Sequence, residues 1–162
     1  MDDEFDRLLR EAIIEELLCP LDSKFLGPVR FIYCYRPPQA PGIGPMPPAR
    51  TFLDALPKSR QAAYAVSFEK HAQGHQLRGE KHHLLAGHEG LYEYKDIESK
   101  SRLIHTTDKW QLVVLLFGFT GKKENKIDQV HVNESERMRD EYRSRRASIE
   151  QKLKQKYPTR SR

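Results

Sequence analysis

Cysteine, long apolar runs and metal-binding motifs are all scarce in this sequence of 162 residues. Its two cysteines, Cys19 and Cys34, do not form a CxxC motif and cannot build the several bridges of a disulfide-rich domain. No apolar run reaches 18 residues, and the first residues are acidic rather than apolar. We therefore expect neither a transmembrane helix nor a secretory signal, and a reducing cytoplasm as the compartment.

The seven histidines do not follow a zinc-binding pattern. His71 and His75 have the spacing of neighbours on one helix face, but Gly74 lies between them and predicts that the helix stops there. His82 and His83 are adjacent, which fits a surface loop. Zinc sites normally add cysteine or carboxylate ligands at defined spacing, so we expect no metal ion and no other cofactor.

The charge distribution favours an acidic partner. The formal net charge is +5 and the isoelectric point is near 9.2. Residues 1–18 contain seven acidic and two basic residues, whereas residues 133–162 contain ten basic and five acidic ones. A basic body and tail of this kind is typical of proteins that bind nucleic acid, although basic proteins without such a partner also occur.

An amphipathic helix is expected at the start of the chain, ending before Pro20. Its apolar residues recur every three or four positions: Phe5, Leu8, Leu9, Ala12, Ile13 and Leu17. A strand over residues 29–35 follows, and then a loop over residues 37–48 in which six prolines prevent strand pairing. Residues 50–56 and 58–73 predict two helices, separated by a proline, that together form a hairpin.

Three successive strands are expected between residues 87 and 123. Alternation in residues 91–95 is typical of a half-buried strand, and the apolar run of residues 112–117 is typical of a strand covered on both faces. The strands end in or carry the basic residues Lys95, Arg102, Lys122 and Lys123. Such residues, brought together on one sheet, would hold phosphate groups. Alternatively, they are solvated edge charges that keep sheets from pairing.

The last part of the chain predicts a long, highly charged helix over residues 133–157. It opens at the capping-box sequence Asn133-Glu134-Ser135-Glu136 and ends at Pro158. Because few of its residues are apolar, we expect the helix to stay unburied, either simply solvated or as an arm that binds RNA phosphates. Its candidate RNA-binding residues are Arg137, Arg143 and Arg146.

The order of these elements, together with three short motifs, resembles the phage-derived Gp49-like, HigB-type branch of the RelE/ParE toxin superfamily. The motifs are F-L-D-x-L-P at residues 52–57, G-L-Y-E at residues 90–93, and L-L-x-G-F followed by two lysines in residues 115–123. The resemblance implies a RelE-like α+β fold with a small antiparallel or mixed sheet of about four strands and a helical hairpin. The toxin domain would span residues 29–145, with an N-terminal helix extension at 1–28 and a basic C-terminal helix end and tail at 146–162.

Members of that family are toxins of type II toxin–antitoxin systems, and many cut mRNA in the ribosomal A site without a metal ion. The resemblance therefore implies a ribosome-dependent mRNA endonuclease that a helix-turn-helix antitoxin neutralises. It assigns catalytic charges to Lys95, Arg102, Lys122 and Lys123. RNA cleavage also needs groups that remove and donate protons. Lys95 is the candidate base and His105 or His88 the candidate acid, while His88 and Tyr92 are candidate contacts to RNA.

Two alternatives stay open. The first is a ParE-like protein that inhibits a topoisomerase by binding, without catalysis. The second is a phage-derived protein that uses the fold for interaction only. Two departures from the family pattern favour it, since Phe117 stands where histidine is common and His105 where an aromatic residue is common. The apolar stripe of the N-terminal helix would cover its own sheet, a second copy of the chain or an antitoxin segment.

Overall fold

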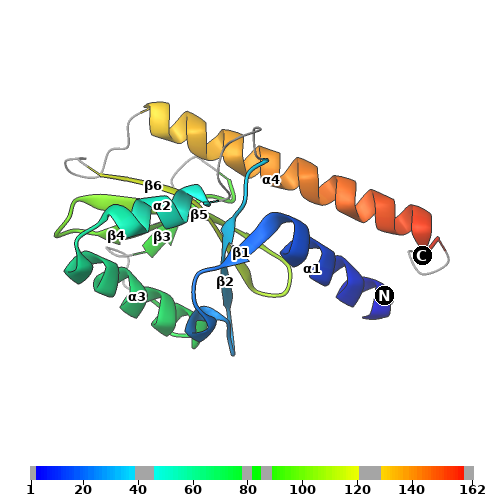
Figure 1. Cartoon of the computed structure of the whole chain (residues 1–162), viewed down its shortest axis with the longest axis horizontal. Coiled ribbons are helices and arrows are strands. Elements are labelled where there is room, and N and C mark those ends of the chain that lie inside the picture. Colours follow the sequence, from blue (N-terminus) through cyan, green and yellow to red (C-terminus); the bar gives the residue numbers. More distant parts are fainter. Residues whose placement is uncertain (1–2, 39–45, 78–81, 85–88, 121–128, 159–162) are drawn as a thin grey trace.

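The computed structural model describes residues 3–38, 46–77, 82–84, 89–120 and 129–158. These residues form one mixed sheet with helices on both faces (Figure 1). The expected α+β class, with a helical hairpin and added terminal helices, is confirmed. None of the described helices combines the length and the apolar composition that crossing a membrane requires.

The sheet has six strands in the order β1-β2-β6-β5-β4-β3. They are β1 (Leu18–Pro20), β2 (Phe31–Tyr35), β3 (His82–Leu84), β4 (Tyr92–Asp96), β5 (Ser101–Asp108) and β6 (Leu112–Thr120). β2 and β6 are parallel, and the other four pairs are antiparallel. The sheet is larger than the about four strands expected because β1 and β3, with three residues each, extend its two edges. Runs this short do not show the alternation that identifies a strand in a sequence.

A β-bulge in β6 determines which side chains share a face of the sheet. Ile104 of β5 pairs with Phe117, and His105 pairs with Leu115, so Leu116 is the extra residue between them. Both Leu116 and Phe117 consequently pack into the core on the face that α1 and α4 cover. The pleat then continues normally toward the end of the strand.

Helices α2 (Pro48–Ala55) and α3 (Lys58–Ala72) form the expected hairpin and cover one face of the sheet. Gly74 follows α3 with a φ of +100°, a left-handed conformation that glycine adopts without a steric penalty. The stop signal read from the sequence is therefore confirmed. A 3-10 turn, η1 (Ser23–Phe25), packs beside α3. The core between these helices and the sheet includes Ile32, Cys34, Leu53, Phe68, Tyr94, Leu103 and Leu115.

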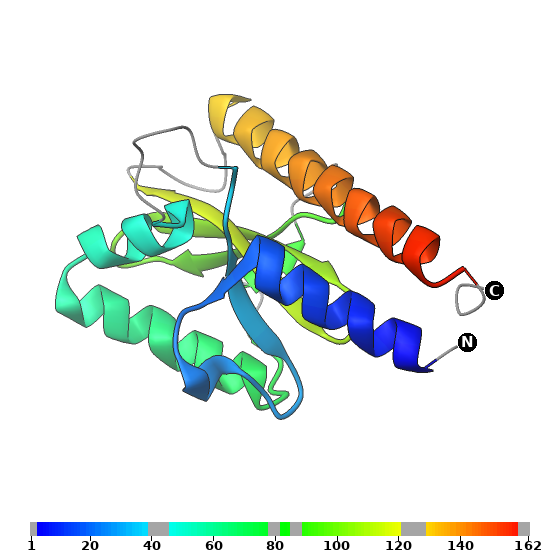
Figure 2. The ribbon, with the colours of Figure 1, turned by 45° about the vertical axis from the view of Figure 1, so that its right-hand side comes forward.

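Helices α1 (Asp3–Leu17) and α4 (Gln129–Lys156) lie side by side on the opposite face (Figure 2). Of the three surfaces that the α1 stripe was expected to cover, the structure shows the first, its own sheet, together with α4. The shared core includes Phe5, Leu9, Ile13, Leu17, Tyr33, Tyr35, Leu112, Val114, Met138, Tyr142 and Ile149. The N-terminal helix is thus an integral part of the core.

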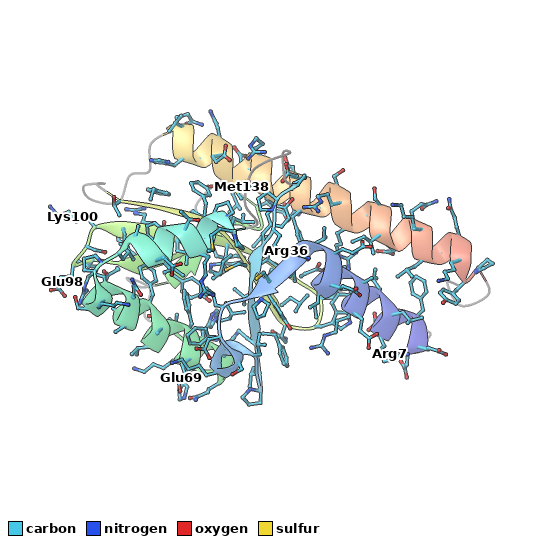
Figure 3. The ribbon with its side chains drawn as sticks, viewed as in Figure 1. Arg7, Arg36, Glu69, Glu98, Lys100 and Met138 are labelled. Atoms are coloured by element: carbon cyan, nitrogen blue, oxygen red, sulfur yellow. The ribbon has the colours of Figure 1, made fainter. Side chains whose placement is uncertain are left out.

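Two expectations for α4 are wrong. The helix begins at Gln129, four residues before the predicted capping box. It is also not fully solvated, because Met138, Tyr142 and Ile149 are buried against the sheet and α1. Met138 is labelled on α4 in Figure 3. These three residues are spaced by four and seven positions, so they form one narrow apolar stripe along the helix. Because most of the other residues of α4 are charged, this stripe is too sparse to predict a buried face from the sequence.

Candidate nucleic-acid interface

A row of three side chains crosses β4, β5 and β6 on the face that α4 covers. Lys95 pairs with Arg102, and Arg102 pairs in turn with Phe119. Paired residues in antiparallel strands point to the same face, and adjacent strands lie about 4.8 Å apart. Arg102 is therefore the direct neighbour of both Lys95 and Phe119, which lie on either side of it about 9.6 Å apart, and we call the three residues the basic–aromatic row.

His131, from the first turns of α4, lies over one end of this row. Its ring stacks on Phe119 with a centroid distance of 4.0 Å and an interplanar angle of 6°. The ring of Phe117 lies 6.3 Å from His131. Both His131 and Lys95 are half-buried, so each is accessible in part to a ligand on this face. An imidazole ring stacked on an aromatic ring thus lies at the β6 end of the row, and the charge of Lys95 lies at its β4 end.

Arg102 itself is directed into the protein. Its Nη1 donates to both carboxylate oxygens of Glu93, at 3.3 and 3.2 Å, and the two side chains are 4% and 0% exposed. The sequence predicts that this guanidinium holds phosphate oxygens. In the structure it contacts Glu93, so a direct phosphate contact would require this buried ion pair to open.

His105 lies on the opposite face of the sheet, beneath α3. Its ring stacks on Tyr94 at 4.4 Å and on Tyr92 at 5.5 Å, and only 1% of the residue is exposed. Nearby, His71 Nδ1 lies 2.5 Å from the hydroxyl of Tyr94, whose pKa is raised by burial. The structure therefore does not bring His105 or Tyr92 together with Lys95 and Arg102.

The three predicted RNA-binding arginines of α4 occupy different environments. Arg137 forms ion pairs with Glu134 and Glu141, yet its side chain is 57% exposed. Arg143 is also exposed and pairs with Glu89 at 3.1 Å. Pairs at this level of exposure are weak and can exchange partners for a phosphate. Arg137 and Arg143 are thus available to an RNA backbone.

Arg146, in contrast, anchors α4 to the sheet. Its Nε donates to Asp108 at 2.8 Å, and its Nη1 donates to Glu150 at 2.7 Å. The same Asp108 oxygen accepts a hydrogen bond of 2.6 Å from Tyr142. Asp108 is only 9% exposed in its side chain, so this arginine compensates a buried carboxylate.

Lys122, Lys123 and His88, three further residues predicted for the site, lie outside the described residues. Sequence reasoning also overlooked two described residues of the site, Glu93 and His131. Glu93 stands in the predicted alternating strand, but nothing in the pattern distinguishes a buried glutamate from a solvated one. His131 lies before residue 133, where the sequence predicts the last helix to begin, so the pattern does not place it on that helix.

Within the described part of the chain, no three side chains of histidine, cysteine, aspartate or glutamate gather as metal ligands. The positive charge of the row itself comes from Lys95 and Arg102.

The fold and the row define a class: a small α+β protein with a row of basic and aromatic side chains on one face of its sheet. The family model described as "Phage derived protein Gp49-like (DUF891)" matches residues 51–140, which is more than half of the chain. The protein therefore belongs to the Gp49-like family, and the resemblance read from the sequence is confirmed. This membership indicates a toxin–antitoxin-related protein. A search of curated proteins found no match.

The matched region has a clear structural meaning. It begins at Thr51 in α2 and ends at Asp140 in α4. It contains the helical hairpin, strands β3 to β6, the whole basic–aromatic row and His131. Helix α1 and strands β1 and β2 lie outside it. The row and His131 thus lie within the family's own region, whereas Arg143 lies just beyond it, and α1 packs against that region.

Proposed function

We propose that this protein is the toxin of a type II toxin–antitoxin pair and that it cleaves mRNA on the ribosome without a metal ion. The observation that carries the proposal is the row Lys95–Arg102–Phe119, with His131 stacked on Phe119 at one end. Family membership gives independent support for the toxin–antitoxin setting. A helix-turn-helix antitoxin and a cytoplasmic location belong to the same proposal.

Each group in the row has a part in the proposed reaction. Cleavage requires the 2′-hydroxyl to lose its proton and attack phosphorus, while the leaving 5′-oxygen gains a proton. Lys95 is the proposed group nearest the 2′-oxygen, where its amine removes the proton or its ammonium stabilises the phosphorane. His131 takes the role of proton donor that the sequence suggested for His105, because His105 lies on the other face of the sheet.

The remaining groups bind the RNA. Phe117 is half-buried beside His131 and offers a surface on which a base can stack. Arg137 and Arg143 are exposed along α4 and can hold backbone phosphates. Arg102, in the middle of the row, pairs with Glu93 of the same face and helps to hold the strands beside Lys95 in place.

The test is induction of the protein alone, followed by primer extension on a translated reporter. Wild-type protein should arrest growth and leave cuts within translated regions. Lys95→Ala and His131→Ala should each reduce cutting by a hundredfold or so, the usual cost of losing one charge or proton-transfer contact. Lys70→Ala is the matched control, because Lys70 is an exposed lysine of α3 on the opposite side of the sheet.

A second candidate function has an observation in its favour. Arg102 and His105, two of the residues that the sequence assigns to catalysis, are both buried. This arrangement suits a ParE-like binder that inhibits a topoisomerase without catalysis. Intact transcripts together with trapped gyrase–DNA complexes after induction would establish the binder and overturn the nuclease.

A further inference from the structure

The two cysteines of the chain are direct partners in the sheet. Cys19 of β1 pairs with Cys34 of β2 in antiparallel register. Both carry free thiols, and no other cysteine exists in the sequence. Their side chains point to the same face because they are paired across an antiparallel ladder.

The ladder also fixes the type of pair that they form. The amide of Arg36 donates to the carbonyl of Leu17, the position just before the Leu18–Tyr35 pair. Hydrogen-bonded and non-hydrogen-bonded pairs alternate along an antiparallel ladder, so Cys19 and Cys34 form a hydrogen-bonded pair. The Cα atoms of such a pair lie about 5.5 Å apart, within the range of about 4.4–6.8 Å found in disulfides.

The surroundings give the two thiols different access to solvent. Cys34 is fully buried against α2, next to Ala49 and Leu53, and its pKa is raised to about 12, mainly by burial and then by the neighbouring Cys19. Cys19 is partly exposed on the edge strand, and its Sγ lies 3.7 Å from the carbonyl oxygen of Pro20. An oxidant from solvent therefore meets Cys19 first.

We propose that Cys19 and Cys34 form a reversible disulfide that staples the edge strand β1, and with it the C-terminal end of α1, to β2. The oxidant is a low-molecular-weight disulfide such as oxidised glutathione. The Cys19 thiolate attacks one of its sulfurs and releases one glutathione thiolate. Cys34 then loses its proton, attacks Cys19 Sγ and releases the second. Two protein thiols are oxidised and one glutathione disulfide is reduced to two thiols.

The position of the bond gives it a structural effect. β1 has only three residues, pairs with a single strand, and follows α1 without a loop. The Cβ atoms of paired residues lie about 4.5–5.5 Å apart, and those of a disulfide about 3.5–4.5 Å apart. The two strands must therefore approach by up to about 1 Å, and a short edge strand can make such a shift. The bond closes a loop of 16 residues, Cys19 to Cys34, and so restricts the unfolded chain as well. It would fasten α1 more firmly over the core that α1 shares with α4.

The experiment uses the full chain in its reduced and oxidised forms. Because burial slows the reaction of Cys34, the disulfide is formed in denaturant and the protein is then refolded, which removes the kinetic barrier. Mass spectrometry should show a loss of two hydrogens and no glutathione adduct. The oxidised form should give the same circular dichroism spectrum as the reduced form and melt about 5–10 °C higher.

Two controls complete the test. Cys19→Ser cannot form the intramolecular bond, so the same treatment should give no species that has lost two hydrogens and no rise in melting temperature. Native reduced protein, incubated with oxidised glutathione, should convert to the same intramolecular form over time, and dithiothreitol should reverse it. An oxidised protein that fails to refold or melts below the reduced form would overturn the proposal. So would a native protein that stops at a stable adduct on Cys19.

Discussion

Arg102 and Glu93 form an ion pair buried on the face of the sheet that α4 covers. Arg102 Nη1 lies 3.2 Å from Glu93 Oε2, and the side chains are 4% and 0% exposed. Because the pair has so little contact with solvent, removing either side chain would leave the charge of the other buried without a compensating partner. Lys95, the neighbour of Arg102 in the same row, is half-buried and keeps access to solvent.

Arg102→Ala should therefore lower the stability of the fold, whatever its effect on RNA cleavage. We expect a loss of about 3–5 kcal/mol, because the substitution removes the guanidinium from a carboxylate that stays buried. Urea denaturation followed by circular dichroism measures this loss. Lys95→Ala should change the free energy of unfolding by less than about 1 kcal/mol. The double variant Arg102→Met with Glu93→Leu should recover most of the stability, and an unstable double variant would contradict this assignment.

The two α4 arginines Arg146 and Arg137 should separate anchoring from RNA binding. Arg146→Ala should cost about 2–4 kcal/mol, because it removes a charged partner from the nearly buried Asp108. Arg137→Ala should cost no more than about 0.5 kcal/mol, since its pairs are exposed. In a filter-binding assay at low salt, Arg137→Ala should weaken binding to a ribosomal RNA fragment. Equal stability losses for the two variants would rule out the anchoring role of Arg146.

Gly118→Ala should disturb the contact between β6 and α2. A Cβ atom placed on Gly118 would overlap the ring of Phe52, which itself packs edge-on against Tyr64 at 6.0 Å. Overpacking of this kind typically costs about 1–3 kcal/mol. Thermal melting should show the loss. Adding Phe52→Leu makes room, so the double variant should lose less than the sum of the two single changes, and strict additivity would contradict the proposed clash.

The glycine also shows what the sequence could reveal. The motif containing Gly118 was recognised as part of a family pattern, but its physical role depends on Phe52, 66 positions earlier. Helices and long strands were predictable because each carries its own periodicity over many residues. β1 and β3 are too short to do so. His105 and Arg102 are three positions apart on β5, so strand alternation places their side chains on opposite faces of the sheet. A single catalytic site that contains both side chains is therefore incompatible with the strand.

The burial of α4 shows the same limit. Its sequence contains too few apolar residues to predict a buried face. The helix is nevertheless held on the sheet by polar contacts: Asp108 accepts hydrogen bonds from Tyr142 and Arg146, and the hydroxyl of Tyr35 accepts one from Arg145. These partners come from distant strands, so no local pattern contains them. Glu93 is buried for the same reason, because its compensating charge comes from β5.

The N-terminal helix should be needed for stability. Ile13 is fully buried in the core that α1 shares with α4 and the sheet, so Ile13→Ala should cost about 2–5 kcal/mol. Glu11→Ala, at an exposed position of the same helix, should cost less than about 0.5 kcal/mol. Deleting residues 1–19 should lower the melting temperature or solubility. A truncated protein that is as stable as the full chain but no longer binds its partner would make α1 an interaction arm instead.

Acid should loosen the start of α1 through Asp6, and the single tryptophan should report it. Asp6 accepts hydrogen bonds from Trp110 Nε1 at 2.7 Å and from Lys109 Nζ at 3.1 Å. The hydrogen bond from Trp110 is the largest cause of the lowered pKa of Asp6, and Lys109 adds to it against the opposing effect of burial. A carboxyl group whose pKa is lower in the folded state stabilises the protein above its unfolded pKa, near 3.9. That contribution is lost as the pH falls through the lower, folded value.

Fluorescence of Trp110, the only tryptophan in the sequence, should therefore stay constant from neutral pH down to about pH 4 and change below it. Lys109 and Arg146 also lie over the indole ring, at 5.3 and 5.8 Å from its centroid. Asp108, bound to Arg146, is the other nearby acid. In Asp6→Asn the amide oxygen can still accept the indole hydrogen bond but cannot titrate. The part of the change due to Asp6 should disappear in this variant, leaving only the change that accompanies general acid unfolding. An identical profile in Asp6→Asn would show that this carboxylate does not control how α1 is held.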